Sequence, residues 1–180
     1  MTGNTNATYM TITDLKRKFI EIYGGTEEGI RVFSSPGRVN LIGEHTDYNG
    51  GYVFPAALTL SSTIVARPRN DRMMNLIATD LGIQVTGSLD RLDEYKTLKW
   101  GNYQAGVADE LQKAGYRLTG CDLLYYDTVP LGAGLSSSAA IEVVTAITLI
   151  SLANSAFGLN QPLDMVEVAK ICQRAENKYV

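Results

Sequence analysis

One segment of the sequence, residues 35–51, carries most of the side chains that could do chemistry. Its polar residues interrupt an otherwise apolar strand pattern and include the chain's single histidine: Arg38, Asn40, Glu44, His45, Thr46 and Asp47. Carboxylates accept hydrogen bonds from the vicinal hydroxyls of a sugar or polyol, and an arginine binds phosphate. A solvated hairpin end with an ion pair between Arg38 and Glu44 is the alternative, and His45 could equally be structural. No second histidine or cysteine pair stands near His45, so a transition-metal site is not expected.

A glycine- and serine-rich segment, residues 130–140, separates a strand pattern from a helix pattern. Its two glycines let the backbone approach an anion, and the N-terminus of the following helix favours phosphate. Three consecutive serines add hydroxyls that can donate to phosphate or bind Mg²⁺. The segment is not a P-loop, because no Gly-Lys-Ser/Thr follows, and Ser137 replaces the third glycine of a dinucleotide fingerprint. A glycine-rich turn with a serine N-cap is the alternative, although one serine suffices for a cap.

Glu176 stands in an apolar helix pattern near the end of the chain. Met165, Val168, Ala169 and Cys172 form a stripe at helical spacing, and Glu176 is predicted to fall near the centre of that face. A carboxylate there is costly unless it is paired or bound to a cation. Two interpretations follow: a frayed helix end at which Glu176 reaches water or a lysine, or a Mg²⁺ ligand near the serine-rich segment.

The elements that must position these residues can be predicted from periodicity and turn signals. Helical spacing indicates helices at residues 14–23, 102–114, 137–157 and 163–177. Strand patterns occur at residues 31–34, 38–44, 52–57, 59–67, 73–79 and 121–127. Asn49-Gly50-Gly51 predicts a tight type I′ hairpin turn, and Asn70-Asp71 a second turn. Strands followed by helices and one late strand predict an α+β fold, a mixed sheet with helices packed on one face.

Composition limits the class of protein. The chain has 180 residues, of which 45% are hydrophobic and 19% charged, as expected for one globular domain. The net charge of −3 argues against a dedicated nucleic-acid binder. The apolar stretch Ala139–Ala153 is shorter than the roughly 20 residues that span a bilayer, and residues 1–13 contain no signal-peptide pattern. A cytoplasmic location, with no membrane or nucleic-acid partner, is therefore expected.

Two long motifs resemble one known family. Residues 37–48, Gly-Arg-Val-Asn-Leu-Ile-Gly-Glu-His-Thr-Asp-Tyr, resemble the galactokinase signature. Residues 130–140 resemble the ATP-binding motif of the wider family of galactokinase, homoserine kinase, mevalonate kinase and phosphomevalonate kinase. Trp100-Gly101-Asn102-Tyr103 and Arg174-Ala175-Glu176-Asn177 also fit galactokinases. The resemblance covers nearly the whole chain from about residue 15 onward.

The resemblance implies a fold like ribosomal protein S5 domain 2, as the N-terminal lobe of a two-lobed kinase that transfers the γ-phosphoryl group of ATP to the C1 hydroxyl of galactose. Residues 1–180 would be that lobe, with a galactose-binding segment at about 14–60 and an ATP-binding segment at about 100–180. Galactose would be bound by Glu44, His45, Thr46 and Asp47, and Arg38 would stabilise charge on the transferred group. The ATP phosphates would be wrapped by Gly132, Ala133, Gly134, Leu135, Ser136, Ser137 and Ser138. Mg²⁺ would be held by Ser138 and Glu176.

One departure from the family pattern concerns the end of the sequence. Galactokinases carry a catalytic aspartate in a Cys-Gly-Ile-Met-Asp-Gln-like segment beyond the position of Glu176, and this sequence ends at Val180. We therefore expect an N-terminal portion without the C-terminal lobe, with little or no kinase activity and a tendency to self-associate, from a monomeric parent. A kinase of another hexose or of N-acetylgalactosamine is an alternative. A galactose- and ATP-binding transcriptional sensor is disfavoured, because such sensors lack part of the serine-alanine run that is intact at residues 136–140.

Overall fold

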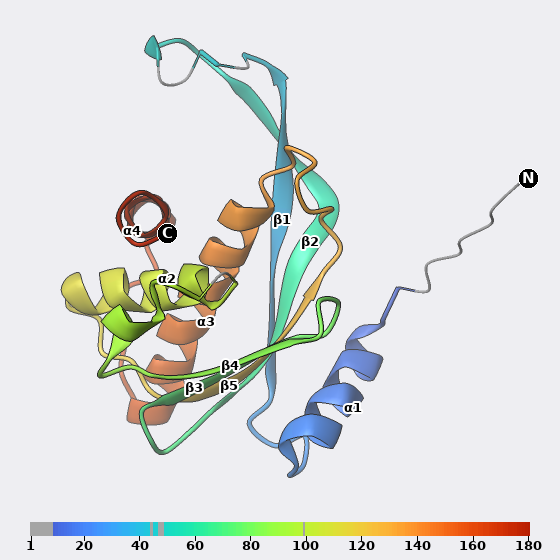
Figure 1. Cartoon of the computed structure of the whole chain (residues 1–180), viewed down its shortest axis with the longest axis vertical. Helices are drawn as coiled ribbons and strands as arrows, with labels where there is room; N and C mark the ends of the chain where they lie inside the picture. The colour runs from blue at the N-terminus through green and yellow to red at the C-terminus, as the bar shows by residue number, and fades with distance from the viewer. Residues whose placement is uncertain (1–8, 44, 47–48, 99) are drawn as a thin grey trace, which may run out of the picture.

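The computed structural model describes residues 9–43, 45–46, 49–98 and 100–180, which form one sheet with helices on both sides (Figure 1). The strands are β1 (Arg31–Ile42), β2 (Phe54–Pro68), β3 (Met73–Ala78), β4 (Ile83–Ser88) and β5 (Cys121–Asp127). The helices are α1 (Ile12–Tyr23), the short 3₁₀ helix η2 (Leu92–Tyr95), α2 (Gly101–Lys113), α3 (Ser137–Phe157) and α4 (Met165–Lys178).

The strand order across the sheet is β1-β2-β5-β3-β4. Strands β3 and β5 are parallel, and the other neighbours are antiparallel. The predicted mixed α+β sheet is therefore confirmed. Because β5 lies beside β2, its C-terminal end delivers the following loop to the part of the sheet where β1 and β2 pair (Figure 1).

Strands β1 and β2 are each continuous where the sequence predicts two strands. The predicted break at Pro36-Gly37 is a register shift between Pro36 and Arg38. Because β1 is an edge strand, the missing N–H of Pro36 does not interrupt a second ladder of hydrogen bonds. Strand β4 and helix η2 were not predicted; β4 is short, lies at the other edge of the sheet, and has three exposed residues among its six.

The helices lie close to their predicted positions. Helix α3 and strand β5 have the predicted bounds, and the ends of α1, α2 and α4 differ from prediction by at most two residues. Helix α1 begins earlier because Thr11 and Asp14 form a capping box. Helix α4 begins later because the carboxylate of Asp164 accepts hydrogen bonds from the N–H groups of Val166 and Glu167.

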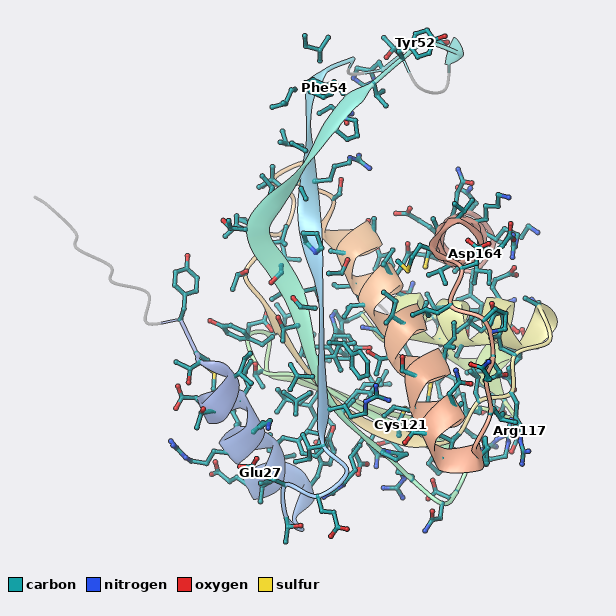
Figure 2. All side chains as sticks on the ribbon, turned by 180° about the vertical axis from the view of Figure 1, so that it is seen from behind. Glu27, Tyr52, Phe54, Arg117, Cys121 and Asp164 are labelled. Atoms are coloured by element: carbon teal, nitrogen blue, oxygen red, sulfur yellow. The ribbon has the colours of Figure 1, made fainter. Side chains whose placement is uncertain are left out.

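Buried side chains form two clusters on opposite faces of the sheet. Ile64 of β2 and Leu123 of β5 belong to the larger cluster, which includes side chains of α2, α3 and α4. Their neighbours Val65 and Leu124 point the other way and meet Phe19 of α1. Figures 1 and 2 show α1 on one side of the sheet and the remaining helices on the other. The predicted one-sided packing thus holds for α2, α3 and α4, whereas α1 covers the opposite face.

Helix α3 is the core helix of the larger cluster. It has 21 residues, and its apolar 18-residue window has a mean hydropathy of 1.6, which is long and apolar enough to cross a membrane, so the length of the predicted stretch Ala139–Ala153 alone does not exclude a span. Within the protein, however, 61% of that apolar window is buried. The hydroxyls of Tyr125 on β5 and Thr145 on α3 lie 2.8 Å apart, which joins the helix to the centre of the sheet.

The connection between β1 and β2 spans residues 43–53, and the predicted tight type I′ turn is wrong. Gly50 has a φ of 75°, but Asn49 is not among the described non-glycine residues with positive φ, as a type I′ turn would require. The hairpin itself is confirmed by the antiparallel pairing of β1 with β2. Figure 2 shows Tyr52 and Phe54 at its outer end, away from the helices.

Candidate functional site

The loop between β5 and α3 has a backbone shaped by left-handed residues. Gly132 and Gly134 have φ values of 70° and 71°, and Ser136 has a φ of 60°. A Cβ built on either glycine would meet no atom within 4 Å, so backbone conformation rather than crowding favours glycine there. A non-glycine residue in this region costs about 1–3 kcal/mol, a strain that tends to occur at functional sites. The loop residues from Leu131 to Gly134 are exposed to solvent.

The first turn of α3 presents N–H groups to this loop. Ser136 occupies the N-cap position but makes no side-chain capping hydrogen bond, so the alternative of a serine N-cap is wrong. The first N–H groups of a helix have no intrahelical acceptor, and the helix dipole places partial positive charge there. Together with the hydroxyls of Ser137 and Ser138, these donors can bind the oxygens of a phosphate group.

The loop is fixed to β1 at Gly37 and Arg38. The Arg38 N–H donates to the Leu135 carbonyl oxygen at 3.0 Å. A Cβ on Gly37 would lie 2.9 Å from that same oxygen and 3.2 Å from a methyl group of Val129, so this close approach depends on glycine. The Arg38 side chain is exposed. This hydrogen bond and close approach join two motifs that are far apart in the sequence, next to the register shift in β1, and β-bulges are common beside functional sites.

Ser138 and Glu176 meet where α3 and α4 approach each other. The Ser138 hydroxyl donates to Glu176 Oε1 at 3.0 Å. Two residues earlier on α4, Arg174 Nε donates to Glu110 Oε2 of α2 at 3.1 Å, which helps to hold α4 in place. The structure therefore brings together the serine and the carboxylate that the sequence analysis assigned to one cation site.

The predicted apolar face of α4 is partly wrong. Met165 and Ala169 are exposed, and the buried face consists of Val168, Ile171, Cys172 and Ala175. Glu176 therefore lies at the edge of the buried face and is exposed to solvent, not at its centre. Burial therefore does not make this carboxylate costly, although its predicted proximity to Ser138 is confirmed.

The buried carboxylate of this region is Glu142, which lies one helical turn beyond Ser138 on α3. Its side chain is 1% exposed, and its Oε1 has no hydrogen-bond partner among the described residues. Burial, with a smaller contribution from the negative charge of Glu176, raises the pKa of Glu142 to about 8. This residue was not predicted from the sequence as a candidate. Its signal was a lone carboxylate four residues after a candidate metal-binding serine in an otherwise apolar helix.

The β1–β2 connection holds the predicted sugar-binding residues, of which Glu44 and Asp47 lie outside the described residues, as does the ion pair proposed for Glu44. His45 has a φ of 62°, and its carbonyl oxygen accepts from Asn49 Nδ2 at 2.8 Å. Thr46 Oγ1 lies 2.6 Å from the Gly43 carbonyl oxygen and 2.9 Å from that of Tyr52. The Thr46 hydroxyl therefore donates its one proton to these backbone carbonyls, which leaves the lone pairs of Oγ1 for a ligand.

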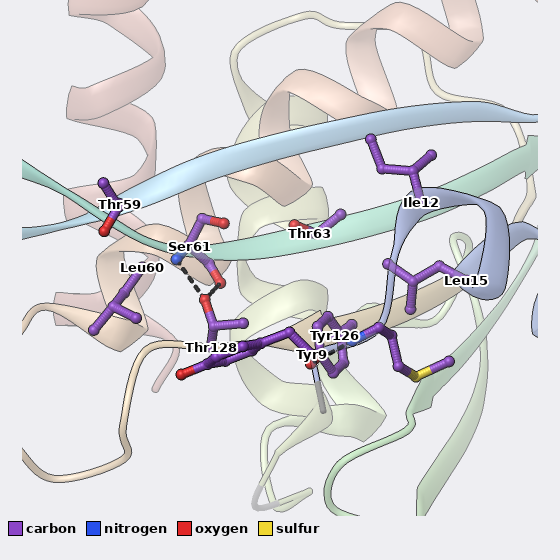
Figure 3. A pocket seen from close by; sticks show the side chains of 10 residues that line it. Tyr9, Ile12, Leu15, Thr59, Leu60, Ser61, Thr63, Tyr126 and Thr128 are labelled. Atoms are coloured by element: carbon purple, nitrogen blue, oxygen red, sulfur yellow. Dashed lines mark hydrogen bonds between the residues drawn. The ribbon is translucent and has the colours of Figure 1, made fainter. Parts of the chain in front are cut away.

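A separate pocket of about 420 Å³ opens on the α1 face of the sheet (Figure 3). It is lined by residues of α1, β2 and β5 and of the segments just before α1 and just after β5, none of them charged, including Leu15, Thr59, Ser61, Tyr126 and Thr128. The Ser61 N–H donates to Thr128 Oγ1 at 2.8 Å, so part of its polar lining is already paired. It lies on the opposite face of the sheet from α3 and contains none of the candidate site residues.

Comparison with known proteins accounts for the pairing of the two motifs. Residues 17–68 match the galactokinase galactose-binding signature, and residues 102–180 match the GHMP kinases N terminal domain. The galactokinase of Clostridium tetani is 44% identical over 171 residues, which cover 95% of this chain and 42% of that relative. The chain matches the N-terminal portion of galactokinases. The resemblance inferred from the sequence is thereby confirmed.

Other galactokinases give the same result. The galactokinase of Lactiplantibacillus plantarum is 45% identical over 175 residues, covering 95% of this chain and 43% of that protein. The crystal structure of Lactococcus lactis galactokinase complexed with galactose has a TM-score of 0.83 at 40% identity, covering 94% of this chain and 43% of that one. A mevalonate kinase structure, at 23% identity and a TM-score of 0.67, shows the shared fold. The chain spans about 42% of the length of its curated relatives and matches their N-terminal portion.

Proposed function

We propose that the protein carrying these residues is an ATP-dependent galactokinase that transfers the γ-phosphoryl group of ATP to the C1 hydroxyl of galactose. The hydrogen bond between the Arg38 N–H and the Leu135 carbonyl carries this proposal, because it holds the galactose-binding signature against the loop of the GHMP kinase domain. Direct transfer requires the two substrates to be held side by side in a fixed orientation. A backbone contact between the two segments supplies such a fixed relation.

The proposed nucleotide site is the loop that precedes α3. Gly132, Gly134 and Ser136 hold the backbone in the left-handed conformation, and the N–H groups of the first turn of α3 bind the ATP phosphates. The segment assigned to ATP is residues 100–180, and the segment assigned to galactose is residues 14–60. Within the latter, His45 and Thr46, with Glu44 and Asp47, bind the sugar hydroxyls, and the Arg38 guanidinium stabilises charge on the transferred group.

Mg²⁺ is the cation we propose for this site, and the side chains present fit it. Ser138 and Glu176 offer oxygen ligands of the kind that Mg²⁺ prefers, and the buried Glu142 Oε1 beside them has no partner of its own among the described residues. When bound, Mg²⁺ neutralises negative charge on the phosphates and helps to orient them. The chain's own contribution is to hold Ser138 and Glu176 together through the packing of α3 against α4.

The test is a kinase assay on the protein expressed from the complete reading frame that contains this chain. We expect turnover of ATP with galactose, followed as galactose 1-phosphate by ³¹P NMR, and much slower turnover with N-acetylgalactosamine or glucose. Arg38→Ala should lower kcat by about 100-fold or more. Its melting temperature should stay unchanged, because the Arg38 side chain is exposed and its backbone N–H still donates to Leu135.

Two outcomes would contradict the proposal. Binding of galactose and ATP without any turnover would favour a sensor, and faster turnover of N-acetylgalactosamine would change the substrate. Arg38→Lys is the matched control for charge, because it keeps the positive charge and loses the planar fork of the guanidinium. A kcat for this variant between those of the wild type and Arg38→Ala is the expected result.

A further inference from the structure

Glu142 is a costly residue at its position in the core. Its side chain is 1% exposed, and among the described residues nothing donates a hydrogen bond to its Oε1. A buried polar group without a partner typically costs about 1–3 kcal/mol, and a buried charge costs more. Packing alone gives no reason for a carboxyl group there, since α3 is otherwise lined by apolar side chains at its buried positions, apart from two threonines. Both threonines bond backbone carbonyls within the helix.

The position of Glu142 relates it to the two candidate cation ligands. Ser138 and Glu142 are four residues apart on α3 and therefore share one face of that helix. Cys172 and Glu176 are likewise four residues apart on α4. The 3.0 Å hydrogen bond between Ser138 and Glu176 joins these two faces, so Glu142 lies one turn deeper in the same α3–α4 interface.

We infer that Glu142 is a third oxygen-bearing side chain of the cation site formed by Ser138 and Glu176, binding the Mg²⁺ directly or through one of its waters. The inference rests on the proposed function, because it deepens the cation site assigned there. Mg²⁺ usually keeps several of its waters, and carboxylates beyond the direct ligands accept hydrogen bonds from them. A partnerless Oε1 beside the two ligands supplies such an acceptor.

This assignment makes metal binding and helix packing depend on each other. When both groups are ionised and no cation is bound, the carboxylates of Glu142 and Glu176 repel each other across the α3–α4 interface. A divalent cation between them turns that repulsion into attraction to a common charge. We therefore expect the cation to stabilise the contact between α3 and α4, and Glu142→Gln to remove much of that stabilisation while keeping the shape of the side chain.

Mn²⁺ binding tests the inference with a readout other than activity. Free Mn²⁺ is titrated by electron paramagnetic resonance against the full-length protein saturated with a non-hydrolysable ATP analogue. Glu142→Gln should weaken Mn²⁺ binding by about tenfold, which is the usual range for removing a residue behind the direct ligands. Glu176→Gln should weaken it at least as much. Glu167→Gln, which removes an exposed carboxylate paired with Lys170 on the same helix, is the control and should bind as the wild type does.

The outcomes separate this inference from the function on which it rests. Glu142→Gln binding Mn²⁺ within twofold of the wild type, while Glu176→Gln loses it, would overturn the role of Glu142 alone. If both Glu176→Gln and Ser138→Ala bound Mn²⁺ as tightly as the wild type, the cation site itself would be overturned. Because Glu142→Gln replaces a buried ionisable carboxyl group by a neutral amide of the same shape, it should fold about as stably as the wild type without metal. Glu142→Asp keeps the carboxyl group but shortens the side chain. A Mn²⁺ affinity between those of the wild type and Glu142→Gln would support the inference independently.

Discussion

Replacing Gly37 by alanine tests whether the two motifs act through one backbone contact. The new Cβ would lie 2.9 Å from the Leu135 carbonyl oxygen, whereas ordinary van der Waals contacts begin at 3.4 Å. One side must therefore move by about 0.5 Å, which equals the tolerance within which a catalytic arrangement must be held. The φ of Gly37 is outside the left-handed region, so alanine is not excluded by backbone conformation and the effect is steric.

Both stability and nucleotide affinity should fall in the Gly37→Ala variant. Overpacking of this kind costs about 1–3 kcal/mol, which for a chain of this size lowers the melting temperature by roughly 2–4 °C per kcal/mol. The Leu135 carbonyl is the acceptor for the Arg38 N–H, so its displacement also moves the loop proposed to bind phosphate. We expect MgADP affinity, measured by isothermal titration calorimetry, to fall about tenfold, or 1.4 kcal/mol.

A double variant shows which contact matters. Val129→Ala removes the methyl groups that lie 3.2 and 3.3 Å from the new Cβ, but it leaves the carbonyl contact unchanged. Gly37→Ala with Val129→Ala should therefore fail to restore nucleotide affinity. An unchanged melting temperature and unchanged MgADP affinity in Gly37→Ala would refute the argument that this approach positions the loop. Full recovery in the double variant would assign the effect to Val129 instead.

Two further predictions concern charged groups that support the site. Burial, with the charge of Asp80 adding to it, raises the pKa of Asp127 to about 6. Because the pKa of Asp127 is higher in the folded protein than in the unfolded chain, protonation of Asp127 stabilises the folded state. This contribution is complete below about pH 4 and is lost as the pH rises through about 6. At about 1.4 kcal/mol per unit this amounts to at most about 3 kcal/mol. Urea unfolding at pH 4 and pH 7 should show this loss in the wild type and not in Asp127→Asn, and equal pH dependence in both would contradict it. Arg174→Ala leaves the carboxylate of Glu110, whose side chain is 8% exposed, without its arginine. It should lower the free energy of unfolding by about 1–3 kcal/mol, part of which Glu110→Gln should restore in the double variant, and additive losses would contradict the pairing.

The elements with strong local signals could be predicted from the sequence alone. Helix α3 is predominantly apolar and is followed by Gly158, whose φ of 61° suits the left-handed position after a helix. The short edge strand β4 was missed although Ile83-Gln84-Val85-Thr86 alternates apolar and polar residues, because Gly87 limits this run to four residues. Likewise, the buried face of α4 depends on where α2 and α3 lie, which helical spacing alone does not specify. Choosing Met165 and Ala169 for that face was the resulting error.

The contacts within the site were the least predictable part, because partners from distant parts of the chain determine them. Among the described residues, His45 and Ser136 are the non-glycine residues with positive φ, and each lies in one of the two motifs. Such strain persists only where surrounding contacts hold the backbone in place. The Asn49 side chain binds the His45 carbonyl, and the Arg38 N–H binds the carbonyl of Leu135, directly before Ser136. Residue types could therefore indicate which segments do chemistry, whereas the strain and the contacts that offset it arise only when β1 and the loop before α3 are brought together by the sheet.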